Sequence, residues 1–112
     1  MTGTSRIGLL LGSTTPPERI AELARAAEEA GFGELWIPED YFFLGGIAAS
    51  AIVLGATQCI PVGVAVVSSV VRHPALLAME TATLSRAYPA VTTTDGTGIG
   101  PLGFLDDVRE YV

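Results

Sequence analysis

Two adjacent carboxylates, Glu39 and Asp40, are the strongest candidates for chemistry in this sequence. They follow a short apolar segment, residues 34–37, and precede three aromatic residues at positions 41–43. Carboxylates at the end of a buried strand, next to aromatic side chains, are typical of a pocket floor, where they act as hydrogen-bond acceptors or as a general base. We therefore interpret Glu39 and Asp40 as catalytic candidates. The structural alternative is that they cap the following turn.

A second polar group follows the apolar segment 62–67 and contains Ser68, Ser69, Arg72 and His73. Polar side chains at the carboxyl end of a buried parallel strand occupy the place where α/β proteins keep their sites. Arg72 precedes a helical pattern and is placed to bind an anion, with a structural ion pair as the alternative. His73 is the only histidine, so no metal-ligand spacing exists and no metal is predicted. The alternative for the whole segment is a core strand followed by an ordinary loop.

The elements that must position these residues alternate along the chain. Residues 7–11, 34–37 and 62–67 are short apolar segments, and the last is apolar at both parities, which predicts parallel strands covered on both faces. Helical patterns follow each of them, and a weaker fourth strand at 91–94 precedes a short helix at 102–111. This order predicts an α/β fold, either a small open parallel sheet or the first half of a (β/α)8 barrel.

The first predicted helix has both a start signal and a stop signal. Thr15, two prolines and Glu18 have the form of a capping box, and Gly31 suits the position just after the helix. Apolar residues recur at helical spacing over residues 20–27. The charged residues between them, Glu28 included, are interpreted as a solvated face.

Composition restricts the function classes. The chain has 112 residues, a net charge of −6 and a pI near 4.5, which argue for one domain and against nucleic acid or anionic membranes as partners. The charge-free stretch 41–71 exceeds the roughly 20 residues of a membrane span, but Pro61 and several glycines interrupt it. We therefore predict a buried helix and strand there and no membrane partner. The single cysteine, Cys59, is predicted to be a buried structural thiol and fits a reducing, cytoplasmic compartment.

Several segments together resemble one family. They are Ile7 to Leu10, Ala21 to Phe32, Leu35 to Asp40, and Val71 to Ala75 with Ala82-Thr83-Leu84. In this order they resemble the bacterial luciferase-like oxidoreductases, which include flavin-dependent monooxygenases and enzymes of the deazaflavin coenzyme. The resemblance runs from about residue 6 to residue 88 and fades beyond Pro89.

The resemblance implies a TIM barrel that holds FMN or the deazaflavin coenzyme F420 at the carboxyl ends of its strands. It implies a non-prolyl cis peptide that backs the cofactor ring, matching Ala65-Val66 here. Ser68, Ser69 and Arg72 fall in the same cofactor-binding segment. The family's acidic residue and histidine after the second strand match Glu39 and Asp40, so a carboxylate stands where the family has an imidazole.

A complete barrel needs roughly 250 residues. We therefore expect residues 1–112 to form one partial luciferase-like barrel domain, the N-terminal half, in a fragment or truncated product. One function class is an oxidoreductase that, when completed, transfers hydride to or from a small-molecule substrate or activates oxygen at a reduced flavin or deazaflavin. The other is a non-catalytic remnant that acts as a structural or oligomerising module. We expect a homo-oligomer, and a chain that by itself neither turns over nor holds cofactor tightly.

Overall fold

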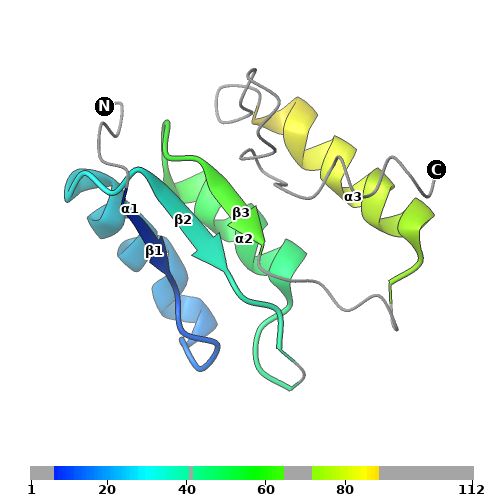
Figure 1. Cartoon of the computed structure of the whole chain (residues 1–112), viewed down its shortest axis with the longest axis horizontal. Helices are drawn as coiled ribbons and strands as arrows, with labels where there is room; N and C mark the ends of the chain where they lie inside the picture. Colours follow the sequence, from blue (N-terminus) through cyan, green and yellow to red (C-terminus); the bar gives the residue numbers. More distant parts are fainter. Residues whose placement is uncertain (1–6, 41, 65–71, 89–112) are drawn as a thin grey trace.

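The computed structural model describes residues 7–40, 42–64 and 72–88, which form a parallel sheet backed by helices (Figure 1). The elements are β1 (Gly8–Leu10), the 3-10 turn η1 (Pro17–Arg19), α1 (Ile20–Glu29), β2 (Glu34–Ile37), α2 (Gly46–Ala56), β3 (Val62–Val64) and α3 (Pro74–Ala87). The strands pair in the order β1-β2-β3, and both pairings are parallel. The predicted α/β alternation of strands and helices is confirmed. The predicted strand at 91–94, the helix at 102–111 and the second half of the segment 62–67 lie outside the described residues.

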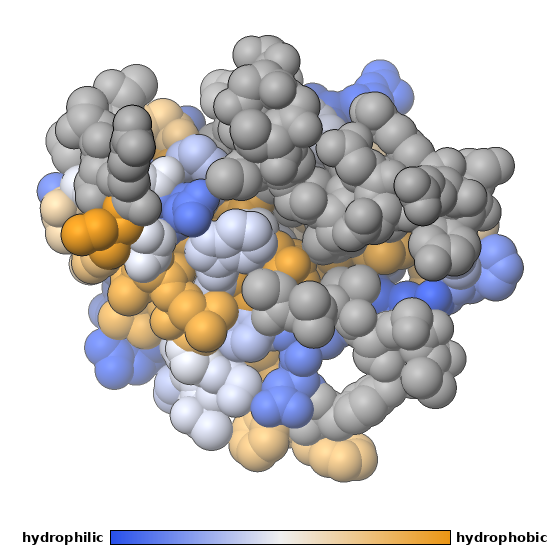
Figure 2. Space-filling view, in the orientation of Figure 1, coloured by the Kyte–Doolittle hydropathy of each residue, from blue (hydrophilic) through white to orange (hydrophobic). Residues whose placement is uncertain are grey.

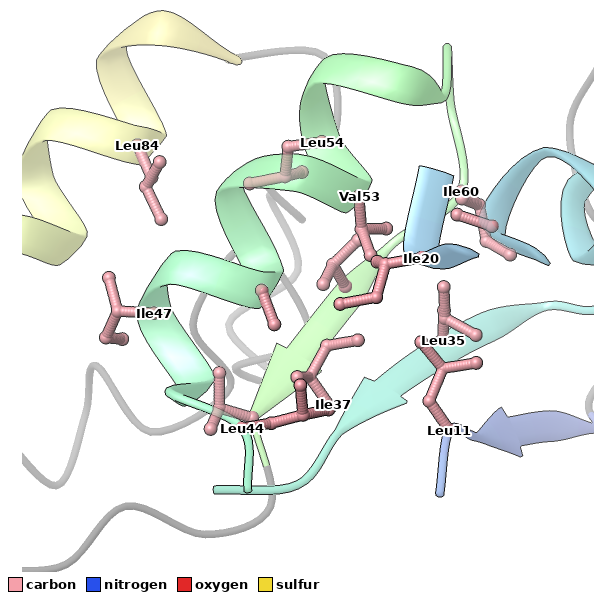
Figure 3. Packing of buried hydrophobic residues seen from close by; sticks show 14 of the residues in the cluster. Leu11, Ile20, Leu35, Ile37, Leu44, Ile47, Val53, Leu54, Ile60 and Leu84 are labelled. Atoms are coloured by element: carbon pink, nitrogen blue, oxygen red, sulfur yellow. The ribbon is translucent and has the colours of Figure 1, made fainter. Parts of the chain in front are cut away.

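The helices cover one face of the sheet. Figure 1 shows α1 and α2 behind the strands, and these two helices pack against each other. Because side chains alternate along a strand, Leu35 and Ile37 of β2 point toward this helical layer. They meet Ile20 of α1 and Val53 of α2, and all four side chains have 0% exposure (Figure 3). Complete burial of each such side chain contributes about 1.5–3 kcal/mol, so this cluster fixes the helical layer on the sheet.

The opposite face of the sheet carries Trp36 of β2. Trp36 pairs with Leu10 of β1 and with Gly63 of β3, so these three residues form one row across the sheet. A Cβ atom placed on Gly63 would lie 2.5 Å from Cζ3 of Trp36, which is closer than real Cβ contacts. The absence of a side chain at position 63 therefore lets the indole ring lie across the third strand.

The start of α1 differs from the predicted capping box. The helix begins at Ile20, after the 3-10 turn, and the Thr15 hydroxyl donates to the Gly12 carbonyl at 2.6 Å instead of capping the helix. Pro16 is extended (φ −60°, ψ 130°) because the residue before a proline disfavours the helical region. Helical backbone therefore starts only at Pro17, one residue too late for Thr15 to cap it.

The predicted stop at Gly31 is confirmed. Gly31 has φ +87°, and the amides of Gly31 and Phe32 donate to the carbonyls of Glu28 and Ala27. These two hydrogen bonds form a Schellman motif, in which glycine adopts the left-handed conformation without a steric penalty.

Glu28 is not part of a solvated face, contrary to the prediction. Its half-buried carboxylate accepts the backbone N–H groups of Gln58, Cys59 and Ile60 at 2.8–3.1 Å, just before β3. Burial would raise the pKa of Glu28, but the three amide hydrogen bonds outweigh burial, so the pKa lies below its ordinary value. Cys59, predicted to be buried, is only half-buried, because it lies in this loop beside Glu28 and not in the core.

No helix in the described part of the chain is long and apolar enough to cross a membrane.

Candidate functional site

Glu39 lies just beyond the carboxyl end of β2 and caps the next helix from outside. Gly45, the residue that precedes α2, has no side chain to do so. Instead, Oε2 of Glu39 accepts the backbone N–H of Gly46 at 2.8 Å. A Cβ atom on Gly46 would lie 2.9 Å from Cγ1 of Val64, so glycine allows α2 to begin directly against β3. The predicted structural role, capping, is therefore confirmed for Glu39.

Arg72 pairs with Glu39 through two parallel hydrogen bonds. Its Nε donates to Oε1 at 2.9 Å and its Nη2 donates to Oε2 at 2.7 Å. The Arg72 guanidinium also donates from Nη1 to Oε2 of Glu80 on α3 at 3.0 Å. The side chains of Arg72 and Glu39 are only 18% and 12% exposed, so water screens their attraction less than that of a surface pair.

The Glu39–Arg72–Glu80 network joins the end of β2, the start of α2 and the side of α3. The hydrogen bond to Glu39 is the main reason why the pKa of Arg72 lies above its ordinary value, although burial acts in the opposite direction. The structural ion pair considered for Arg72 is confirmed. Its role in binding a cofactor stays a prediction, and the pairing means that an anion would compete with two carboxylates for this guanidinium.

Asp40 has an exposed side chain, unlike its neighbour Glu39. Its backbone closes the loop between β2 and α2, because its amide donates to the Leu44 carbonyl at 3.2 Å and its carbonyl accepts from Phe43 at 3.1 Å. The two predicted catalytic carboxylates therefore occupy different environments: one is engaged in the network and one faces solvent.

Two aromatic side chains project from this loop. Phe42 is 103% exposed and Phe43 is 58% exposed. Phe42 has φ +69°, a left-handed conformation that is uncommon for a bulky residue. Figure 2 shows apolar side chains at the lower tip of the view, where Figure 1 places the loop between β2 and α2.

The loop and the start of α3 line an open hollow of about 520 Å³. This volume lies within the range of small-molecule sites. We name it the β2–α2 hollow. Its lining residues are Glu39, Asp40, Phe42, Phe43, Leu44, Gly45, Arg72 and Leu76.

His73 has a structural role at the start of α3. Its Nδ1 accepts the Ala75 backbone N–H at 3.0 Å, and Pro74 occupies the first helical position, so the pair starts α3 next to Arg72. Within residues 7–40, 42–64 and 72–88, no group of three or more His, Cys, Asp or Glu side chains is arranged to hold a metal ion.

The sequence profile of the luciferase-like monooxygenase family matches residues 2–89. The chain belongs to this family. It is also similar to the solved structure of the coenzyme F420 dependent tetrahydromethanopterin reductase from Methanopyrus kandleri, with 29% sequence identity and a TM-score of 0.65. That match covers 70% of this chain and 23% of the reductase chain, so this chain spans less than a quarter of the reductase. The described strands and helices therefore correspond to part of a luciferase-like TIM barrel.

The structure brings Glu39, Asp40 and Arg72 together around one hollow. The other predicted site residues, Ala65, Val66, Ser68 and Ser69, lie outside the described residues, and so does the expected cis peptide. Sequence reasoning missed Glu80, because its pairing with Arg72 depends on how α3 is oriented. It also missed the left-handed backbone of Phe42, for which an aromatic residue gives no signal.

Proposed function

We propose that this chain supplies one side of the cofactor and substrate site of a luciferase-like oxidoreductase, which transfers hydride or activates oxygen at a reduced FMN or coenzyme F420. The family match over residues 2–89 carries the proposal. The position of the β2–α2 hollow supports it, because parallel α/β folds bind ligands at the carboxyl ends of their strands. The similar reductase, which depends on coenzyme F420, makes a deazaflavin as plausible a cofactor as a flavin.

The described residues fit the ring of such a cofactor but not its phosphate. Phe42, Phe43 and Leu76 give the hollow apolar walls, and the exposed Asp40 carboxylate is a hydrogen-bond acceptor at its edge. Among the described residues, Arg72 is the only cation that lines the hollow, and it is already paired with carboxylates. When bound, the reduced ring would supply the hydride or the electrons for oxygen.

The two acidic residues would then have different roles. Both carboxylate oxygens of Glu39 accept hydrogen bonds, from Arg72 and from Gly46, so Glu39 would position the loop and the start of α2. Asp40 is exposed at the hollow and would be the residue that accepts or donates a proton at the substrate. Ala65, Val66, Ser68 and Ser69 remain the residues proposed to contact the cofactor ring.

A flavin series tests the proposal with the purified 112-residue chain. We would titrate riboflavin, FMN and coenzyme F420, following fluorescence and sedimentation together. Since the described site recognises the ring and not the phosphate, riboflavin and FMN should bind weakly and within about twofold of each other. Absence of riboflavin binding up to its solubility limit, or a large preference for FMN, would contradict this proposal.

The second candidate is a non-catalytic module that assembles with further copies of the chain in the cytoplasm. The exposure of Ile7 (66%) and Leu10 (59%) along β1, which is an edge strand among the described strands, favours this candidate. A stable oligomer that binds none of the three cofactors would support the module over the enzyme.

A further inference from the structure

We propose that, beside the cofactor ring, the β2–α2 hollow receives an apolar, uncharged or cationic aromatic part of the substrate and disfavours an anionic substrate group. This inference rests on the proposed function, since it names the substrate class of the same site. It depends on three features of the hollow: how the loop displays its phenyl rings, what faces them, and the balance of charge around them.

The loop displays the phenyl rings at a conformational cost. A left-handed backbone is unfavourable for a residue with a bulky side chain, and such conformations cluster at functional sites. At Phe42 the surrounding hydrogen bonds of Asp40 with Phe43 and Leu44 hold the backbone in this state. The result is a ring that is fully exposed next to a second ring that is more than half exposed. Two adjacent exposed phenyl rings in a hollow are suited to stack on, or pack edge to face with, a flat ligand.

The start of α3 adds an apolar side chain to the lining of the hollow. Leu76 lies in the first turn of α3 and is 41% exposed. The cap formed by His73 and the proline at the first helical position hold this turn in place. A substrate ring in the hollow can therefore pack against Phe43 or Leu76, whose side chains are already exposed there.

The charge around the hollow selects against anions. The part of the lining that the structure describes contains two carboxylates, Glu39 and Asp40, and one guanidinium, that of Arg72. The Nε and Nη2 groups of Arg72 donate to Glu39, and its Nη1 donates to Glu80. The two carboxylates offset the positive charge of the guanidinium, so an incoming anion is attracted only weakly. Asp40 is exposed at the edge and would repel an anion, whereas it would attract a cation that also lies over a phenyl face.

A pair of fluorescent probes with the same aromatic frame tests this selectivity on the full chain. N-phenyl-1-naphthylamine is uncharged, and 8-anilinonaphthalene-1-sulfonate adds one anionic group. We expect the uncharged probe to bind one site per chain and at least about tenfold more tightly than the sulfonate. Asp40→Asn should bring the two affinities closer by improving sulfonate binding several-fold, with little effect on the uncharged probe.

Ring-removing variants locate the probe. Phe42→Gly removes one ring and introduces a residue that adopts the left-handed backbone without strain, so the loop should remain folded. Together with Phe43→Ser it should weaken binding of the uncharged probe by about tenfold or more. Met79→Ser is the matched control, because Met79 is 62% exposed but does not line the hollow, and it should leave binding unchanged.

Equal affinity for both probes, or equal losses in the loop variants and in Met79→Ser, would overturn the inference. The outcome is separable from that of the flavin titration, because no cofactor is present. If riboflavin binds but the two probes bind equally, the proposed function is supported and the inferred substrate class is refuted. If the uncharged probe binds more tightly than the sulfonate but riboflavin does not bind, the selectivity of the hollow is supported and the proposed function is refuted.

Discussion

Gly63→Ala tests whether the open face of the sheet is built as described. The substituted methyl group would lie 2.5 Å from Cζ3, 2.7 Å from Cε3 and 3.0 Å from Cη2 of Trp36. The ring must therefore move, because a rigid indole cannot relieve three short contacts by bending. Overpacking of this kind costs about 1–3 kcal/mol of unfolding free energy. For a domain of this size, that corresponds to a fall in Tm of at least about 4 °C.

The assay uses the tryptophan itself as the reporter. Trp36 is the only tryptophan in the chain, so its emission reports on this one contact without a background signal. Urea unfolding followed by this emission gives the stability change, and the native emission should shift to the red as the ring leaves its place across β3. Gly12→Ala is the matched control, since its new Cβ would meet only Oγ1 of Thr15 at 3.8 Å and should cost little.

A double-mutant cycle decides whether the cost comes from the ring. Trp36→Phe removes the six-membered ring atoms that the methyl group would meet. In that background, followed by circular dichroism, Gly63→Ala should cost at least about 1 kcal/mol less than in the wild type. An unchanged stability and emission for Gly63→Ala alone would show that the indole does not lie over β3, and the account of this face would be refuted.

Three further perturbations address the site and its supports. Phe42→Gly should raise the unfolding free energy by up to about 1 kcal/mol by relieving the left-handed backbone, whereas Phe43→Gly should lower it by about 0.5–1 kcal/mol; equal effects in urea unfolding would contradict this difference. Arg72→Met should cost about 2–4 kcal/mol because it leaves the largely buried Glu39 carboxylate without its guanidinium, and Glu39→Gln in that background should restore part of the loss. Glu28→Gln should flatten the acid limb of the stability curve. Because the pKa of Glu28 is lowered, its contribution is complete above about pH 4.5 and is lost as the pH falls through the folded-state value. An unchanged acid limb would therefore argue against the hydrogen bonds between Glu28 and the amides before β3.

The sequence predicted the strands and helices well where the pattern of residues reflects local physics. Continuous apolar segments predicted β2 at its observed bounds, and Gly31 predicted the end of α1. The capping box at Thr15 was wrong because two successive prolines delay the helix, an effect that outweighs the match of the motif.

The candidate site was predicted only in part, because its decisive contacts are tertiary. Glu39, Asp40 and Arg72 were identified from their places at strand ends, and the structure does group them around one hollow. The different roles of these residues were not predictable, because they depend on their partners. Glu39 binds Gly46, which is 7 residues away in the chain, and Arg72 binds Glu80, which is 8 residues away. The same holds for Glu28, whose amide partners lie 30–32 residues further along.

The most direct test of the central claim is to map riboflavin on the chain by solution NMR. In an amide-detected titration of the isotope-labelled protein, the account predicts shift changes at the β2–α2 loop and the start of α3, including Asp40, Gly46 and Leu76. The chemical shifts of the Gln58 and Cys59 amides, which lie at the opposite end of the sheet beside Glu28, should not change. Shift changes centred on α1 or on the loop that Glu28 binds, or no changes up to the solubility limit of riboflavin, would contradict a cofactor site at the carboxyl ends of these strands.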